Sequence, residues 1–402
     1  MTSPLLVLSD THLSRAYGTR TSEALAQLIV EHPRSEIVLN GDIFDLSLDA
    51  PNVPVCESLE AVLKHHQTLV EVLKSHVSSG SKLTFIPGNH DAALADTEAT
   101  AFLQKRLGAK GGKHVEITPW FARRGDVHIE HGHLYDPDCA TNHPLANPSA
   151  RSEGLGTALM RRFCSPNDAL SFAHANQVTP GSGLLQTIRQ WGPRAPLIIT
   201  NYFRTAISLC LEAGLHGERI ARAQLQGEAR LEQYAEKKGH TATILRALLI
   251  LAPEPTHHSF KSTFLRLYFD RVLSGLVLLF GAALLLLAGF GSPLGLSGFL
   301  PAKAFLTGTG ILLALGAGAY LALNLLKEGN RYGDLVIDQL SEAAKGVGAL
   351  TKSQLVIFGH SHVEVDEPGY VNSGSFGLGG QKRPYLLVEP GGSYERHYLE
   401  IT

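Results

Sequence analysis

Leu5-Leu6-Val7-Leu8 runs directly into Ser9-Asp10-Thr11-His12 near the start of the chain. A short, unbroken run of apolar residues is typical of a strand that is buried on both faces. A carboxylate and an imidazole directly after such a strand stand at its carboxyl end. We therefore predict a buried strand over residues 5–8 that presents two potential metal ligands at one sheet edge.

The same arrangement, an apolar run followed by a polar cluster, returns four more times along the chain. The apolar runs cover residues 37–39, 83–86, 127–129 and 355–358. The clusters that follow them are Gly41-Asp42-Ile43-Phe44-Asp45, Gly88-Asn89-His90-Asp91, His131-Gly132-His133 and Gly359-His360-Ser361-His362. Each run reads as a buried strand, so we expect five strand ends to converge on one edge.

The side chains in these clusters indicate divalent metal ions. Carboxylate, imidazole and amide ligands together suit borderline ions such as Mn, Fe or Zn better than ions that prefer thiolate. A single Asp-x-His would more often be a turn or a helix cap, but five clusters that each follow a strand point to a metal site. Because six or seven such ligands exceed the needs of one ion, we predict a pair of metals.

The order and composition of the clusters resemble the calcineurin-like metallophosphoesterase superfamily, whose pattern is D-x-H, G-D-x-x-D, G-N-H-D/E, H and G-H-x-H. The resemblance covers residues 1 to about 135 and 350–402. It implies an α/β fold of four layers, a pair of mixed β-sheets face to face with helices outside (αββα). It also implies a hydrolase with two divalent ions, for which manganese is favoured and iron or zinc are the alternatives.

The resemblance also assigns roles by position. One metal would be held by Asp10, His12 and His362. The other would be held by Asn89, His131 and His360, with Asp42 as the bridge between the two. His90 would be the catalytic histidine and Asp45 its carboxylate partner. His131 is preferred to His133 as a ligand because the residue directly after the strand is the usual ligand in this family.

Two stretches, 272–291 and 304–326, contain no charged residue and consist mainly of Leu, Ala, Gly and Phe. Each is long enough to cross a hydrocarbon core of about 30 Å as a helix. The link between them, residues 292–303, contains Pro293, Pro301 and several glycines, as expected of a tight hairpin outside the membrane. We therefore predict a two-span transmembrane hairpin, and the alternative is a buried helical hairpin in a soluble core.

Basic residues predict the orientation of this hairpin. They flank it on the side of the metal clusters, with Lys261, Arg266 and Arg271 before it and Lys327 and Arg331 after it. The link holds only Lys303. Positively charged flanks favour the cytoplasmic side, and the N-terminus shows no secretory signal. We expect a protein of the inner (cytoplasmic) membrane whose catalytic domain faces the cytoplasm.

The hairpin separates the first four metal clusters from the last, so the chain must cross the membrane twice before it completes its site. Residues 140–270 belong to neither motif block and have helical character, clearest in 205–238. The predicted organisation is therefore a first part of the core (1–139), a helical insertion or lid (140–270), the hairpin (271–327) and a second part of the core (328–402).

Several functions fit this organisation. A net charge of −2 argues against nucleic acid as a partner. Within the superfamily, the chain partly resembles the branch that cleaves the pyrophosphate of UDP-2,3-diacylglucosamine, which also inserts helices before its last metal cluster. His90, however, stands where many members of that branch have arginine, and the branch lacks an internal two-span hairpin.

The favoured prediction is a membrane-anchored phosphoesterase or pyrophosphatase that meets the bilayer and a phosphorylated or pyrophosphorylated lipid beneath its lid. Arg161, Arg162, Arg194 and Arg204 have the chemistry to bind phosphate, but surface arginines are common, so none of them is assigned to the site. One alternative is a tethered hydrolase of soluble nucleotides, phosphomonoesters or phosphoproteins. The other is an inactive membrane scaffold with the same fold. The sequence does not determine the oligomeric state.

Overall fold

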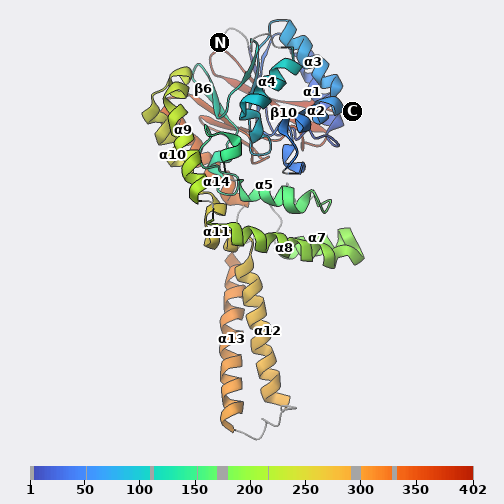
Figure 1. The fold of residues 1–402 in the computed structure, drawn as a ribbon, viewed down its shortest axis with the longest axis vertical. Helices are drawn as coiled ribbons and strands as arrows, with labels where there is room; N and C mark the ends of the chain where they lie inside the picture. The colour runs from blue at the N-terminus through green and yellow to red at the C-terminus, as the bar shows by residue number, and fades with distance from the viewer. Residues whose placement is uncertain are drawn as a thin grey trace.

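Two β-sheets pack face to face in a head, and a long helical hairpin projects from it (Figure 1). The computed structural model describes residues 4–50, 52–108, 113–151, 153–169, 180–215, 217–290, 300–327 and 333–401. Helices cover the outer face of each sheet. The described part of the chain therefore has two sheet layers between two helical layers, with the hairpin attached at one side.

The six-stranded sheet has the order β11-β10-β1-β2-β3-β4. Its strands are β1 (Leu5–Leu8), β2 (Glu36–Asn40), β3 (Leu83–Ile86), β4 (Val115–Ile117), β10 (Lys382–Val388) and β11 (Tyr394–Glu400). Strands β1 to β4 are parallel to one another, and β10 and β11 add antiparallel neighbours. Leu6 and Leu8 pack under the outer helices, whereas Leu5 and Val7 face the second sheet. The helices on this side are α1 (Thr19–Glu31), α2 (Val55–His65), α3 (Gln67–Ser78) and α4 (Thr97–Arg106).

The five-stranded sheet has the order β5-β6-β7-β9-β8. Its strands are β5 (Phe121–Arg124), β6 (Val127–Glu130), β7 (Leu355–Phe358), β8 (Glu364–Glu367) and β9 (Tyr370–Ser373). β7 lies parallel between β6 and β9, so the chain beyond the hairpin completes a sheet that began before it. The outer face is covered by α9 (Gly217–Lys238), α10 (Ala242–Leu251) and α14 (Gly333–Thr351).

All five strands predicted before the polar clusters are present. The expectation of a single sheet edge is wrong, because β1, β2 and β3 belong to one sheet and β6 and β7 to the other. The ends still meet, since the sheets face each other and their loops are hydrogen-bonded across the interface. Asn40 Nδ2 donates to the carbonyl of Glu130 at 3.0 Å, and the amide of His360 donates to Asp10 Oδ2 at 3.0 Å.

The helical segment expected over 205–238 is two helices. α8 (Ala195–Glu212) ends before Gly214, whose φ of +83° breaks the helix, and α9 begins at Gly217. The insertion therefore divides in two. α9 and α10 complete the outer layer of the core, and the rest packs between the head and the hairpin (Figure 1). This second group contains α5 (Leu155–Leu159), the π-helical turn η6 (Met160–Cys164), α7 (Pro180–Trp191), α8 and α11 (Phe260–Arg266).

The hairpin consists of α12 (Phe269–Phe290) and α13 (Leu300–Lys327), both long and apolar enough to cross a membrane. They pack closely where a side chain on Gly281 would collide with the carbonyl of Gly310. The predicted link lies mostly outside the described residues, which stop at 290 and resume at 300, and Arg331 lies outside them too. Pro301 belongs to the first turn of α13 rather than to the link.

Candidate metal centre

The loops that carry the predicted site have an unusual backbone. Five of their non-glycine residues have positive φ, at values from 49° to 68°: Asp10, His12, Asp42, His360 and His362. Such left-handed conformations cost free energy and persist only where the surroundings impose them. For Asp10, His12 and Asp42, hydrogen bonds between the loops after β1 and β2 do so, from the amide of Asp10 to the carbonyl of Gly41 and from the amide of His12 to the carbonyl of Asp42.

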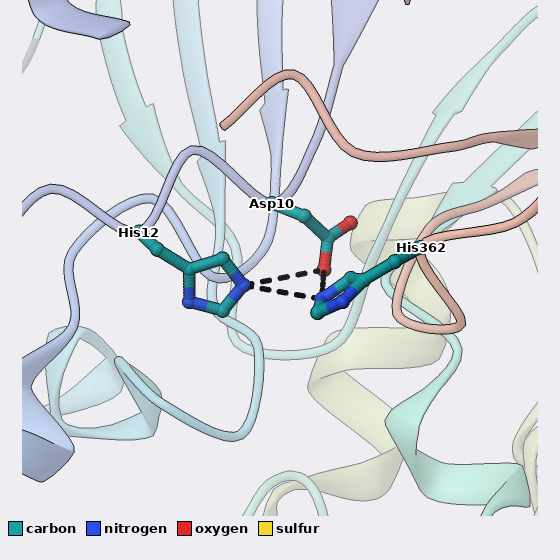
Figure 2. A group of neighbouring side chains, drawn as sticks. All are labelled: Asp10, His12 and His362. Atoms are coloured by element: carbon teal, nitrogen blue, oxygen red, sulfur yellow. Dashed lines mark hydrogen bonds and ion pairs between the residues drawn. The ribbon is translucent and has the colours of Figure 1, made fainter. Parts of the chain in front are cut away.

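Asp10, His12 and His362 form a first group of ligand atoms (Figure 2). Nε2 of His362 lies 3.2 Å from Asp10 Oδ1 and 3.2 Å from Nε2 of His12. Asp10 is fully buried, and among the described residues its Oδ1 has no geometrically good hydrogen-bond donor. Two imidazole nitrogens and a carboxylate oxygen directed at one point are a suitable donor set for a divalent cation.

Asp42, His131 and His360 form a second group. Nδ1 of His131 donates to the carbonyl of Asn40 at 3.0 Å, which leaves its buried Nε2 facing Asp42 Oδ2 at 3.2 Å. Asp42 also groups with His12 and His90, so it stands between the two sets. The amide oxygen of Asn89 is buried and has no hydrogen-bond partner in the part of the chain that the structure describes.

The buried carboxylates give the centre negative charge. Burial alone would raise the pKa of Asp42, but His131, His90 and His12 hold that pKa well below its usual range. Burial would lower the pKa of His131, yet Asp42 and Asp10 raise it to about 9. Ionised carboxylates beside imidazoles in a low-dielectric interior favour the binding of a cation.

His90 has a different environment from the other imidazoles. Its Nδ1 lies 2.8 Å from Asp45 Oδ1 and 2.9 Å from the hydroxyl of Ser47, which itself donates to Asp45. Burial would lower the pKa of His90, but Asp45 and Asp42 outweigh burial and raise it to about 10. This pairing favours the charged imidazolium, the form that can donate a proton.

Asp91 and Gly88 shape the loop that presents His90. Asp91 accepts hydrogen bonds from the amides of Gly88, Ile43 and Phe44 at 2.7–3.1 Å, so it orients both loops rather than pointing at the ligand groups. Gly88 does not have a positive φ. A side chain there would collide with Asp42, so the glycine is required for close approach.

Two residues beside the centre have no counterpart in the sequence prediction. Asp136 Oδ2 lies 2.9 Å from Nε2 of His360 and fixes the orientation of that ring. Arg151 is buried, and its Nε and Nη2 donate to the carbonyls of Ala146 and Pro144. Within the described residues no carboxylate pairs with it, whereas the anticipated Arg161 and Arg162 are paired with glutamates.

Cys139 groups with Asp136 and His360, but it is a poor candidate for a metal ligand. Burial raises the pKa of its thiol well above the usual range, with Asp136 and Asp138 acting in the same direction. A thiol must lose its proton to bind a metal. The group is better described as the surroundings of His360.

The arrangement matches a known family. The calcineurin-like phosphoesterase family model matches residues 3–183. This part of the chain is a calcineurin-like phosphoesterase domain. The match includes the first four polar clusters, and β7 adds His360 and His362 from beyond it. The chain is therefore a metal-dependent phosphoesterase, and its buried His/Asp groups fit the two metals that the family typically binds. No curated protein matches the chain.

Proposed function

We propose that the chain is a membrane-anchored dimetal phosphoesterase that cleaves a phosphoester or pyrophosphate bond of a lipid-linked substrate. The observation that carries the proposal is the combination of one buried ligand cluster with a helical hairpin whose apolar surface is exposed. The cluster supports metal-dependent hydrolysis of a phosphoester, and the hairpin supports a location at the membrane. The orientation toward the cytoplasm and the inner membrane rests on the basic flanks of the hairpin.

The proposed ligands divide into two sets. One metal would be held by Asp10, His12 and His362, and the other by Asn89, His131 and His360, with Asp42 shared by both. A bound pair of divalent ions would polarise the phosphoryl oxygens and supply a hydroxide nucleophile at neutral pH. Their identity is proposed as manganese, with iron or zinc as alternatives, because the ligands are oxygen and imidazole. Asp136 orients His360 through its hydrogen bond to Nε2.

His90 is the proposed general acid. Its Nδ1 is held by Asp45 and Ser47, which orients the ring, and the charged imidazolium is the form that can donate a proton to the leaving oxygen. Asp45 stabilises the imidazolium before transfer and holds the ring afterward. The backbone amide of His90 donates to Asp42 Oδ1 at 2.8 Å, which ties the position of the acid to that of the bridging carboxylate.

Arg151 is the proposed phosphate-binding residue on the protein side. Its segment, η5 (Pro148–Ala150), packs on η2 (Ala92–Ala95), which directly follows the His90 loop. Two nitrogens of Arg151 donate to the carbonyls of Ala146 and Pro144, so its guanidinium group is oriented before substrate binds. A guanidinium that pairs with no carboxylate among the described residues suits a phosphate oxygen.

The hairpin supports membrane anchoring. In the most apolar window of α12 and of α13 only 11% of residues are buried, whereas a core helix of a soluble protein would be mostly buried. Leucines and phenylalanines such as Leu279, Phe280 and Phe305 point outward along both helices. Such a surface is stable in lipid and is an aggregation hazard in water.

A lipid-linked substrate is favoured because the insertion borders the site and continues into the hairpin. The hydroxyl of Ser165, which follows η6, donates to the carbonyl of Leu48 at 2.9 Å, close to Asp45. α8 packs on η6, and α11 joins this group to α12. A head group at the centre would therefore lie beside helices that lead to the bilayer. The alternative, a tethered hydrolase of soluble phosphoesters, uses the same centre.

Matched substrate panels test the proposal. Detergent-purified, Mn-loaded protein would be assayed for phosphate or nucleotide release from lipid-linked pyrophosphates, including UDP-diacylglucosamine, and from soluble phosphoesters. A kcat/KM at least about a hundredfold higher on the lipid panel, equal to about 2.7 kcal/mol, is expected. Equal rates would favour the soluble alternative. No release from either panel, with both metals bound, would overturn the proposal.

A deletion tests anchoring separately. Replacing residues 272–326 with a short flexible linker should release the protein from membranes. If the substrate is lipid-linked, the deletion should also reduce activity on acylated substrates more than on a generic phosphoester.

A further inference from the structure

The helices α7 and α8 form an arm at the junction between the head and the hairpin. In Figure 1 the arm runs across the axis of the hairpin, just above the point where α12 and α13 leave the head. The connectivity agrees, because α11 packs on α8 and leads directly into α12. The arm therefore lies at the level where the hairpin begins.

One face of α8 is buried against α5 and η6, and α5 lies between α8 and the head (Figure 1). Ala206, Leu209 and Cys210 lie in an apolar cluster with Leu155 and Ala158 of α5. Ile198 of the same face packs with residues of η6. The buried residues recur at the three- and four-residue spacing of one helix face. This face of α8 is therefore directed toward the head.

The opposite face of α8 is exposed and mostly apolar. Leu197, Ile207 and Leu211 have exposed fractions of 60%, 49% and 66%. Thr200 and Arg204 are exposed between them, and the five residues form a continuous row, here named the α8 stripe. At 3.6 residues per turn, the stripe lies opposite Ala206 and Leu209. Because the buried face is directed toward the head, the stripe faces the direction in which the hairpin extends.

Charge on the arm is predominantly positive. Arg189, Arg194 and Arg204 are exposed. Glu212, the only acid in 185–212, is bonded to Arg162 at 2.7 Å. α7 adds two further exposed apolar side chains, Leu185 and Ile188. An apolar face edged with arginine is typical of a helix that lies in the interface of a bilayer containing anionic lipid.

We propose that the arm lies flat on an anionic bilayer surface, with the α8 stripe in the interface. The arm would thereby hold the metal centre at a fixed height above the lipid, because α8 packs on η6 and Ser165 after η6 is bonded to Leu48 beside Asp45. This inference rests on the proposed anchoring by the hairpin. It adds a second, peripheral contact with lipid, and it identifies the side of the head from which a lipid head group would approach.

Spin labels on the full-length chain in nanodiscs test the inference. Single cysteines would be placed by Ile207→Cys and Leu211→Cys in the stripe, in a background without the native cysteines. Val30→Cys, an exposed apolar position on α1, is the matched control in water. Leu279→Cys on α12 is the control in lipid. The collision rates of each label with oxygen and with a water-soluble nickel chelate report lipid or water.

The expected result is that labels at 207 and 211 resemble the label at 279 and that only the label at 30 is open to nickel. Labels at 207 and 211 that resemble the label at 30, with 279 in lipid, would overturn the arm inference and leave anchoring intact. Nickel access at all four positions would overturn both. Spin–spin broadening at 207 or 211 would assign the stripe to a second copy of the chain and overturn the inference.

Lipid composition tests the charged part of the inference. In discs of phosphatidylcholine alone, the labels at 207 and 211 should become at least about twofold more open to nickel than in discs with 30% phosphatidylglycerol, and equal access would overturn the anionic preference. If the background without cysteines does not fold, Leu211→Trp and Val30→Trp replace the labels, and each is compared with the natural chain, whose Trp120 and Trp191 set the baseline. Brominated lipid should quench the fluorescence that Leu211→Trp adds and not the fluorescence that Val30→Trp adds, and equal quenching of the two added signals would overturn the inference.

Discussion

Asp136 Oδ2 and His360 Nε2 lie 2.9 Å apart, although their residues come from opposite sides of the hairpin in the sequence. This bond fixes which imidazole nitrogen of His360 carries the proton, so Nδ1 is the nitrogen left for a metal. We predict that Asp136→Ala lowers metal affinity or activity by about 10- to 100-fold. The measurement is the Mn concentration that gives half-maximal activity, together with the metal content after dialysis.

Asp136→Asn is the matched variant for this prediction, because it keeps an oxygen that can accept the bond from His360. It should lose less metal affinity than Asp136→Ala. An alanine variant with the Mn dependence of the natural protein would remove Asp136 from the support of the centre.

The apolar runs in the sequence predicted the positions of the strands but not which sheet each strand joins. Leu5–Leu8 and Leu355–Phe358 are buried on both faces, and such strands appear as unbroken apolar runs. Which sheet a strand joins depends on pairings between residues far apart, such as Val127 with Leu355, and no local pattern encodes them. The break at Gly214 also went unpredicted, because the helical spacing continues on both sides of it.

Some residues of the candidate site could likewise be predicted from the sequence, and others could not. Side chains directly after strands, such as Asp10 and His131, could be predicted because the strand places them. Asp136 follows an irregular segment, and Arg151 lies in a loop whose carbonyls hold it, so only the folded chain shows their surroundings. In the sequence, Arg162 is as suitable for phosphate binding as Arg151, but in the structure it forms an ion pair with Glu212.

Asp42 lies in the second ligand group and also lies close to His12 of the first, so its loss should affect both metals. We predict that Asp42→Asn binds fewer than two ions per chain and loses its turnover, because the shared negative charge is gone. Metal analysis by mass spectrometry, with phosphatase assays on the same preparation, checks this. Full turnover and full metal content in the variant would contradict the dimetal assignment.

His90 should be needed for turnover rather than for metal binding. We predict that His90→Gln lowers kcat by about 10²- to 10⁴-fold while the metal content is kept. Asp45→Asn should have a smaller effect in the same direction, because it weakens the hold on the ring. The loss should be larger for phenyl phosphate than for p-nitrophenyl phosphate, whose leaving group needs less protonation. An equal loss on both substrates would argue against a general acid.

Arg151 should contribute to phosphate binding. We predict that Arg151→Lys raises the inhibition constant for inorganic phosphate by about 10- to 100-fold, since a charge-assisted bond is worth roughly 1.5–3 kcal/mol. Arg162→Ala is the control, because that guanidinium already pairs with Glu212 and should leave phosphate inhibition unchanged. A lower melting temperature for Arg151→Lys with unchanged phosphate inhibition would show a purely structural role.

Glu116 joins the core to the end of α9 and should make stability depend on pH. Burial would raise its pKa, but Lys238, Lys82 and Arg124 outweigh burial and lower the pKa to about 2. A carboxylate with a depressed pKa stabilises the fold above its unfolded value, near 4.5, and loses this contribution as pH falls toward 2. We predict that Glu116→Gln lowers the free energy of unfolding by about 2 kcal/mol at pH 6.5.

Thermal unfolding in detergent, followed by tryptophan fluorescence, tests this prediction. The difference in stability between the natural protein and Glu116→Gln should narrow from pH 6.5 to 3. Glu71→Gln, which removes an exposed pair with Lys74, is the control and should leave stability almost unchanged. A gap for Glu116→Gln that stayed constant over this range would mean that the variant weakens packing rather than the ion pairs.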